Sequence, residues 1–178
     1  MKKINHYLGR RTIIIGDVNS GKTSETLRIL NLFLKKGYAD KIGIIDLAPD
    51  VIRGIGGKMV PPKKTPLLYL TTTILAPRLT GKNEYHTIQL AEKNATAIEK
   101  LFKKFRREKK EILFVNDATL YLQAGKLQQL TKILDTTSTQ IINAYYGDTF
   151  PDSELTRREK KLTEDLMKIC DHVIKLPY

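Results

Sequence analysis

Hydrophobic positions along the chain follow two patterns, short continuous runs and stretches with helical spacing. The runs are rich in β-branched residues, as in Thr12-Ile13-Ile14-Ile15, and they are too short to form helices. We therefore interpret each run as a buried strand. The predicted strands cover residues 12–15, 41–46, 67–70, 112–115, 140–144 and 172–176.

Between the runs, apolar residues recur at intervals of three and four, which predicts amphipathic helices. Leu27, Leu30 and Leu34 have this spacing ahead of Gly37, where a helix would end. The other predicted helices are a long one with Ala91, Ala95, Ile98, Phe102 and Phe105 on one face, one from Gln123 to Leu134, and one from Ser153 to Ile169 with Leu155, Leu162, Leu166 and Ile169 inward. Alternating strands and helices predict an α/β three-layer sandwich. Its mostly parallel sheet of about six strands would carry helices on both faces, in a single domain over residues 1–178.

A glycine-bounded loop follows the first predicted strand. It fits G-x-x-x-x-G-K-[ST], the phosphate-binding loop (P-loop) of nucleoside triphosphatases, with the sequence Gly16-Asp17-Val18-Asn19-Ser20-Gly21-Lys22-Thr23. A strand before the loop and a helix after it are the context that this motif requires. Glycine at positions 16 and 21 permits backbone conformations closed to larger residues, so successive N–H groups can converge on phosphate oxygens. The positive end of the helix dipole adds to the same anion site.

Two side chains of the loop carry the predicted chemistry. Lys22 can reach the β- and γ-phosphates, and the Thr23 hydroxyl can bind Mg²⁺. ATP and Mg²⁺ are therefore the predicted cofactors, with adenine as the base because no guanine-selecting Lys-x-Asp follows Asn143. The predicted nucleotide-binding residues are Gly16, Asp17, Val18, Asn19, Ser20, Gly21, Lys22, Thr23 and Ser24.

Acidic residues at predicted strand ends are candidates for the magnesium shell and for a catalytic base. Asp46 ends the second strand, where open α/β sheets bind ligands, and it could contact the metal, deprotonate a hydroxyl or only cap the next turn. Asp50 is a weaker second candidate. Asp117 is the first choice for a second metal-binding acid, although Asn116 takes the position that the strand edge presents most directly. The absence of a following glutamate argues against a fast hydrolytic motor.

Two loops and one helix offer cations for phosphate contacts. Residues 51–66 are rich in glycine, proline, lysine and arginine, which predicts a long connection that contacts phosphate or is merely mobile. Residues 71–82 begin with three consecutive threonines beside a strand end and include Arg78 and Lys82, so they could bind substrate phosphates or cap the strand. Arg157 and Arg158, early in the last helix, could stabilise transition-state charge or lie solvated.

The chain is strongly basic, with a formal net charge of +12 and a pI near 9.7. This excess favours a polyanionic partner such as RNA or DNA, or else a lysine-rich solvated surface. The stretch 103–110 concentrates six cations at the end of the long helix, where they form a polyanion site or answer the helix dipole. One cysteine excludes an internal disulfide, and no apolar run is long enough to span a membrane, so we expect a cytoplasmic protein.

Together these motifs resemble the kinase domain of polynucleotide 5′-hydroxyl kinases, the group of the pre-mRNA cleavage-factor kinase and its ribosomal-RNA-processing relatives. The resemblance covers roughly residues 10–145. It rests on the phosphate loop, on Asp46-Leu47-Ala48-Pro49, on the threonine-rich loop ending at Pro77 and on Val115-Asn116-Asp117. The family's base-stacking Gly-Trp pair is missing, because the chain has no tryptophan.

The resemblance implies specific roles for these residues. Lys22 and Thr23 would hold ATP and magnesium, Asp46 would activate the acceptor hydroxyl, and Arg157 and Arg158 would act as lid arginines. The sequence then favours an ATP-dependent kinase acting on a nucleic-acid or nucleotide hydroxyl. The alternatives are a slow ATPase that works as a switch for a partner, and a nucleotide-responsive nucleic-acid-binding module.

Overall fold

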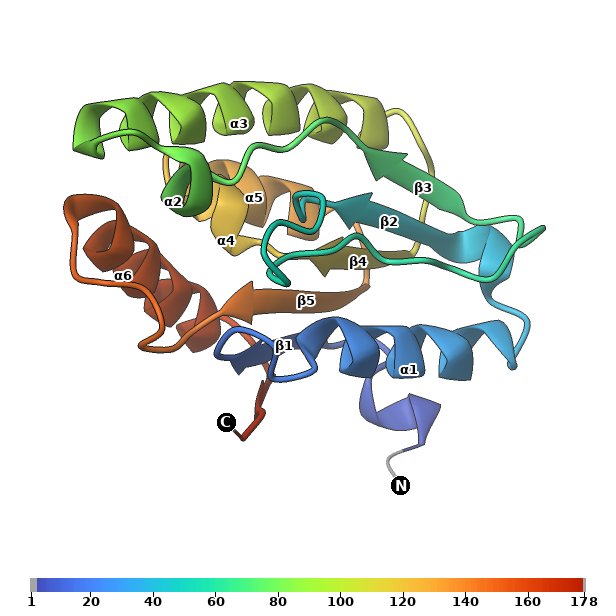
Figure 1. Ribbon diagram of the computed structural model, residues 1–178. Helices are drawn as coiled ribbons and strands as arrows, with labels where there is room; N and C mark the ends of the chain where they lie inside the picture. Colours follow the sequence, from blue (N-terminus) through green and yellow to red (C-terminus); the bar gives the residue numbers. More distant parts are fainter. Residues whose placement is uncertain (1–2, 178) are drawn as a thin grey trace.

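All six strands run parallel in one sheet, in the order β3-β2-β4-β5-β1-β6 (Figure 1). The computed structural model describes residues 3–177. The strands are β1 (Arg11–Gly16), β2 (Ile42–Asp46), β3 (Leu68–Thr71), β4 (Ile112–Asn116), β5 (Thr139–Tyr145) and β6 (His172–Lys175). The predicted α/β sandwich with a six-stranded parallel sheet is confirmed.

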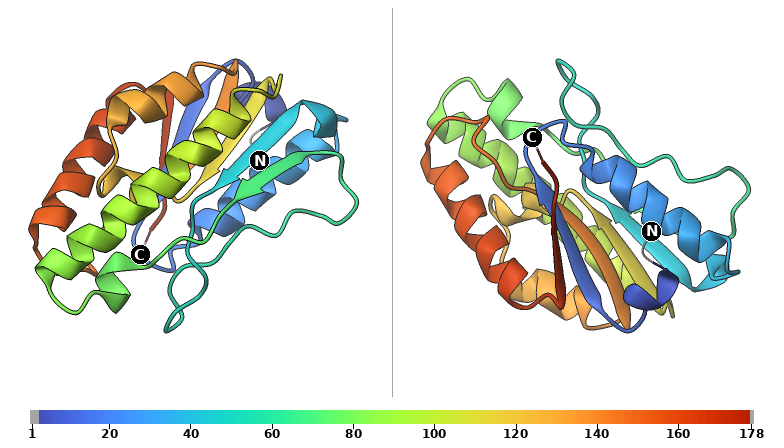
Figure 2. Two further views of the ribbon diagram at one scale, coloured as in Figure 1. Left: turned by 90° about the horizontal axis from the view of Figure 1, so that it is seen from above. Right: turned by 90° about the horizontal axis from the view of Figure 1, so that it is seen from below.

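Helices cover both faces of this sheet (Figures 1 and 2). The longer helices are α1 (Lys22–Leu34), α3 (Glu84–Phe105), α5 (Leu127–Leu134) and α6 (Glu154–Lys168). The short ones are η1 (Ile4–His6), η2 (Ala39–Lys41), α2 (Pro77–Thr80) and α4 (Thr119–Leu122). The α1 helix packs on one face with η1, and α3 to α6 pack on the other. Within residues 3–177, no helix has the length and apolarity needed to cross a bilayer.

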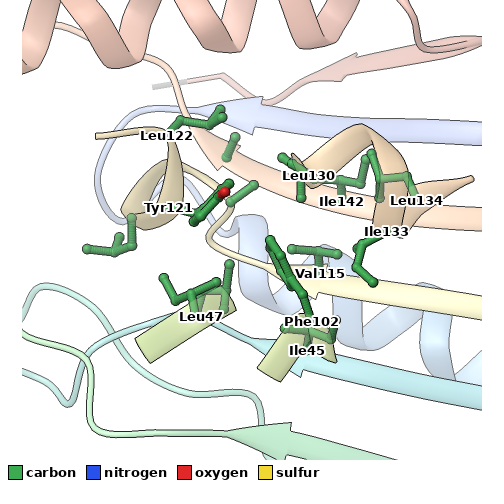
Figure 3. Close-up of a cluster of buried hydrophobic side chains, with 14 of the residues drawn as sticks. Ile45, Leu47, Phe102, Val115, Tyr121, Leu122, Leu130, Ile133, Leu134 and Ile142 are labelled. Carbon is green, nitrogen blue, oxygen red and sulfur yellow. The ribbon is translucent and has the colours of Figure 1, made fainter. Parts of the chain in front are cut away.

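Alternate strand residues supply two separate hydrophobic cores. Val115 and Ile142 point to the α3–α6 side, whereas their neighbours Phe114 and Ile141 pack with α1 on the other side. Figure 3 shows the larger core, in which Phe102 of α3 lies beside Val115, with α4 and α5 side chains above the sheet. Both faces are buried, which explains why the strands read as continuous apolar runs.

The predicted helix from Gln123 to Leu134 is wrong in its first turn. The chain forms α4, then a turn at residues 123–126, and only then α5. At this turn Gly125 lies so close to the Tyr121 ring that a Cβ on it would come within 2.4 Å of the ring. The close approach fixes the break and directs Gln123 toward α6, where its amide donates to Glu159 (3.0 Å).

Two helices also bury faces that differ from the predicted ones. The buried residues of α1 are Thr26, Ile29, Leu30 and Phe33, while the predicted Leu27 and Leu34 are only partly buried. Thr26 is drawn inward because its hydroxyl accepts a hydrogen bond from buried Asn143. In α6, Leu155 and Leu166 are buried as predicted and Leu162 partly, but Ile169 is 42% exposed because the helix ends at Lys168.

The strand order sets the geometry of the site. Because β5 lies between β1 and β4, the loop after β1 faces the residues after β4 across the end of β5. The carboxyl ends of these strands meet at one edge of the sheet, where ligands of open parallel sheets bind. The three strand ends carry the phosphate loop, Asn116-Asp117 and Asn143-Tyr145.

Candidate nucleotide site

A cavity of about 310 Å³ opens at this edge of the sheet, within the range of small-ligand sites. Its walls come from the phosphate loop, residues 48–57, residues 76–79, the region after β4 and the end of β5. The predicted loop residues that line it are Val18, Asn19, Gly21, Lys22, Thr23 and Ser24, whereas Gly16, Asp17 and Ser20 do not. The cavity and the motif found in the sequence therefore coincide.

The phosphate loop has the backbone that its glycines permit. Gly21 is left-handed (φ +87°) immediately before α1, and Asn19 is left-handed as well (φ 56°). Gly16 lets the chain turn back on itself, since a Cβ there would meet the Ser20 hydroxyl at 2.4 Å. The loop thus wraps the amino end of α1, where the helix dipole favours an anion.

Lys22 points back over this loop. Its ammonium donates to the Asp17 carbonyl (2.5 Å) and lies 6.0 Å from the centre of the Tyr145 ring. Burial lowers the pKa of Lys22, and the carboxylates of Asp117 and Asp17 act in the opposite direction. A partly buried ammonium held at a loop of backbone amides is the group that a triphosphate tail requires.

Asp17 braces the loop instead of facing the cavity. Its carboxylate accepts hydrogen bonds from Val18 N (2.6 Å), Asp148 N (3.1 Å) and the Thr149 hydroxyl (2.6 Å). Burial alone would raise the pKa of Asp17, but these hydrogen bonds, with the charge of Lys22, lower it. Asp17 therefore ties the phosphate loop to the segment after β5, a side-chain role that the motif does not predict.

Buried amides connect the strand ends beneath the cavity. Asn143 of β5 donates to Thr26 Oγ1 (2.8 Å) and to Asn116 Oδ1 (2.7 Å), and it accepts from Asp117 N (2.7 Å). Thr23 Oγ1 also lies 3.4 Å from Asn116 Oδ1. An amide, not a carboxylate, thus faces the predicted metal-binding hydroxyl. Sequence reasoning missed Asn143, although an asparagine that directly follows two isoleucines in a predicted buried strand signals a polar group that needs partners.

Asp46 lies under the cavity floor, fully buried and outside the cavity lining. Its Oδ1 accepts from Ala48 N (3.1 Å) and Asn116 Nδ2 (2.8 Å), and its Oδ2 accepts from Met59 N (2.6 Å) and the Tyr69 hydroxyl (2.7 Å). Four donors occupy the carboxylate, so it has no oxygen directed at a substrate or metal. This geometry replaces the expected roles of base and metal ligand with a structural one, the anchoring of residues 48–59 to the sheet.

Asp46→Asn should therefore act on stability first. The substitution replaces one carboxylate oxygen by an NH₂ group, which then faces two buried hydrogen-bond donors. We expect this change to lower the free energy of unfolding by about 2–4 kcal/mol. Urea unfolding followed by circular dichroism measures it, with exposed Asp50→Asn as the matched control. Unchanged stability together with lost turnover would return Asp46 to catalysis.

The long connection after β2 forms part of the cavity wall. Ile55, Gly56 and Gly57 line the cavity, and Lys58 turns away from it to donate to Ala48 O (2.7 Å) and Thr71 Oγ1 (2.9 Å). All three hydrogen bonds of the Lys58 ammonium go to the protein, with Thr72 O (3.2 Å) as the third acceptor. The residues of this connection that line the cavity therefore carry no charge.

Asp117 is the acid that does line the cavity. It adopts a left-handed conformation (φ 57°), held by the hydrogen bond from its N–H to Asn143, and its Oδ1 is buried without a hydrogen-bond partner among residues 3–177. Burial raises the pKa of Asp117, while the charges of Lys22 and Arg78 act in the opposite direction. An unpartnered carboxylate oxygen near a lysine and an arginine is the arrangement expected of a group that works on a ligand.

Arg78 is the arginine that reaches the cavity. Its guanidinium stacks over the Phe150 ring at 3.8 Å from the ring centre and over Tyr145 at 4.9 Å, and it is paired with buried Glu159 of α6. The two predicted lid arginines lie elsewhere, since Arg157 pairs with exposed Asp152 and Arg158 donates to Gly125 O (2.7 Å). Arg78 lines the cavity, whereas Arg157 and Arg158 do not.

Glu159, the partner of Arg78, makes the stability of the protein depend on pH. Burial raises the pKa of Glu159 to about 7, against the opposing effects of Arg78 and Gln123. Between the ordinary glutamate pKa of 4.5 and pH 7, the folded state binds more protons than the unfolded state. The stability that this group contributes is therefore complete below pH 4.5 and is lost as pH rises through 7.

We expect Glu159→Gln to remove this loss. In the natural protein, the group should lower the unfolding free energy by on the order of 2 kcal/mol between pH 5 and pH 8, and the variant should lack this decrement. Urea unfolding of both proteins at pH 5, 6, 7 and 8 measures the difference. Equal pH slopes in the two proteins would contradict the raised pKa.

Metal binding here would depend on the nucleotide. No cluster of three or more His, Cys, Asp or Glu side chains suited to a metal ion occurs in residues 3–177. The donors near the phosphate loop are the Thr23 hydroxyl, the Asn116 amide oxygen and the unpartnered Oδ1 atom of Asp117. Such oxygens suit Mg²⁺, which keeps several waters and binds through substrate phosphates with only one or two protein groups.

Comparison with known proteins supports the fold. No family model matches the chain, and no curated protein matches its sequence. Among solved structures, the flagellar accessory protein FlaH from Methanocaldococcus jannaschii superposes with a TM-score of 0.54 at 12% identity, over 95% of this chain and 71% of that one. The Pif1 helicase from Candida albicans superposes with a TM-score of 0.45 at 14% identity, over 94% of this chain and 36% of that one. The sheet, the loop between β1 and α1 and the similarity to FlaH identify a P-loop NTPase fold.

Proposed function

We propose that this protein binds ATP with Mg²⁺ and cleaves the bond to the γ-phosphate slowly. The observation that carries the proposal is the meeting of three features in one cavity: the phosphate loop, the Lys22 ammonium and the unpartnered oxygen of Asp117. The loop amides and Lys22 would hold the triphosphate, with Thr23 and Asn116 beside the metal. Bound Mg²⁺ would neutralise charge that develops on the phosphates.

Asp117 would act as the base in this proposal. It would accept a proton from water as the water oxygen bonds to the γ-phosphorus and the bridging P–O bond breaks, leaving ADP and inorganic phosphate. Arg78 would stabilise charge on the transferred group from the far side of the cavity. Its pairing with Glu159 and its stacking on Phe150 fix the guanidinium in place before the nucleotide binds.

A second candidate is transfer of the γ-phosphate to a hydroxyl of a nucleic acid or nucleotide. Its support is the position of Pro77 and Arg78, because the segment that resembles an acceptor clamp lines the cavity opposite the phosphate loop. In that reaction Asp117 would take its proton from the acceptor hydroxyl instead of from water. Asp46, fully bonded beneath the floor, has no part in either version.

One experiment separates the two reactions. The protein is incubated with γ-³²P-ATP and Mg²⁺, alone and with 5′-hydroxyl RNA or DNA oligonucleotides. The products are resolved by thin-layer chromatography and by gel electrophoresis. Hydrolysis predicts labelled orthophosphate in every mixture, and transfer predicts labelled oligonucleotide. If neither product exceeds the level of a Lys22→Ala preparation, the catalytic part of the proposal fails.

A further inference from the structure

The amino edge of the sheet, opposite the nucleotide cavity, carries a concentration of exposed cations. The α1 and α3 helices both end there (Figures 1 and 2), just before the chain enters β2 and β4. The two connections touch, since Glu111 N donates to Lys41 O (3.0 Å) and Lys110 Nζ donates to Asp40 O (2.6 Å). We call this surface the basic edge; its exposed cations are Lys35, Lys36, Lys103, Lys104, Arg106, Arg107 and Lys109.

These cations have no acidic partners. Within residues 3–177, no ion pair joins any cation of the basic edge to a carboxylate. On α6 the situation is reversed, because Arg157, Lys160 and Lys168 each pair with a nearby aspartate. The net charge of +12 is therefore distributed unevenly, with seven exposed cations at the basic edge against the exposed carboxylates of Asp40, Glu108 and Glu111, the last of which pairs with Lys41.

The helix dipole accounts for only part of this charge. Lys103 and Lys104 lie in the last turn of α3, where cations offset the negative end of the dipole. Arg106, Arg107 and Lys109 follow the helix end at Phe105, and the dipole effect does not extend far beyond the last turn. Holding these three like charges together is unfavourable in the free protein, and a polyanion would relieve it.

We propose that the basic edge binds nucleic acid through its phosphate backbone, independently of base sequence. Lysine and arginine are the usual partners of backbone phosphates. A membrane surface fits less well, because peripheral membrane binding combines cations with inserted apolar side chains. The exposed large apolar residues of the described chain are Val51, Val60, Tyr85, Ile169 and Val173, all outside the basic edge.

This surface lies at the opposite end of the strands from the phosphate loop. Nucleic acid at the basic edge and nucleotide in the cavity would bind without competing for the same residues. The proposal thus goes beyond nucleotide cleavage and stands or falls separately. A variant that loses nucleotide binding at Lys22 should keep its affinity for nucleic acid.

The test compares two variants of equal charge. One replaces four cations of the basic edge (K103Q/K104Q/R106Q/R107Q), and the control replaces four on α6 (R157Q/K160Q/K161Q/K168Q). Fluorescence anisotropy with a fluorescein-labelled 30-nucleotide single-stranded RNA is measured between 50 and 200 mM KCl. Circular dichroism and urea unfolding verify that both variants are folded.

We expect the basic-edge variant to bind at least about 10-fold more weakly at 100 mM KCl, with the slope of log affinity against log salt reduced by about 3, since each lost phosphate contact removes about 0.7. The α6 control should stay within about 2-fold of the natural protein. Equal losses in both variants would show that overall charge alone is responsible. That result would overturn the proposal, as would a failure of the natural protein to bind RNA while it binds phosphatidylserine vesicles.

Discussion

Lys22→Ala should weaken ATP binding by at least about 100-fold and reduce turnover to background. The substitution removes the ammonium that would contact the β- and γ-phosphates, a charge-assisted interaction that contributes about 3 kcal/mol, or roughly two orders of magnitude in affinity. The side chain is partly buried, and its one hydrogen bond within residues 3–177 is to the Asp17 carbonyl, so its loss should leave the fold intact. Isothermal titration calorimetry with ATP and Mg²⁺ measures the effect.

The matched control is Lys93→Ala, which removes an exposed lysine of α3 far from the phosphate loop. It should bind ATP like the natural protein. If Lys22→Ala is folded and still binds ATP with near-natural affinity, the phosphate loop is not the nucleotide site.

Asp117→Asn should lower the rate of ATP cleavage by about 100-fold or more while changing ATP affinity less than about 3-fold. A positioned general base contributes roughly two to four orders of magnitude in rate, and an amide cannot accept the proton. Asparagine also tolerates the left-handed backbone at this position, so the hydrogen bond from its N–H to Asn143 should survive. Steady-state phosphate release and calorimetry together separate the two effects.

Asp50→Asn is the control for this variant, because Asp50 is exposed and lies outside the cavity lining. Its turnover should match that of the natural protein. Cleavage at the natural rate by Asp117→Asn would remove Asp117 from the mechanism and leave water positioning to the phosphate loop itself.

The parts of the fold that depend on local sequence could be predicted. The four inner strands β1, β2, β4 and β5 are short runs that are buried almost throughout, and the phosphate loop is defined by residues within eight positions of one another. The Ser153 cap of α6 was equally local, since its hydroxyl accepts from Thr156 N (3.1 Å). The buried face of α1 could not be predicted from local sequence, because the inward orientation of Thr26 depends on Asn143, 117 residues away.

The roles of the acidic residues depend on such long-range contacts. Asp46 ends its strand as an active-site acid would, and only its donors at Met59 and Tyr69 reveal that its Oδ2 atom is already hydrogen-bonded within the protein. The Asn116 amide oxygen accepts a hydrogen bond from Asn143, which also accepts from Asp117 N, and the Asp117 carboxylate lines the cavity. A strand-end acid alone does not show which way its carboxylate points.

The positions of the arginine side chains also depend on contacts between residues far apart in the sequence. Arg78 belongs to a segment whose cations were expected to contact phosphate, but its place in the cavity depends on Glu159, 81 residues further along the chain. Arg157 and Arg158 are close in sequence to Glu159 and point elsewhere on α6. Helical periodicity gives the faces of α6 but not which of its residues contacts Arg78, since that depends on how α6 packs against α4.

Calorimetric titration of the natural protein with ATP in the presence and absence of Mg²⁺ tests the central claim most directly. The account predicts saturable one-to-one binding with a dissociation constant in the micromolar range, lost on Lys22→Ala and kept on Lys93→Ala. No heat of binding for ATP at millimolar concentration, with magnesium present and the protein folded, would contradict it.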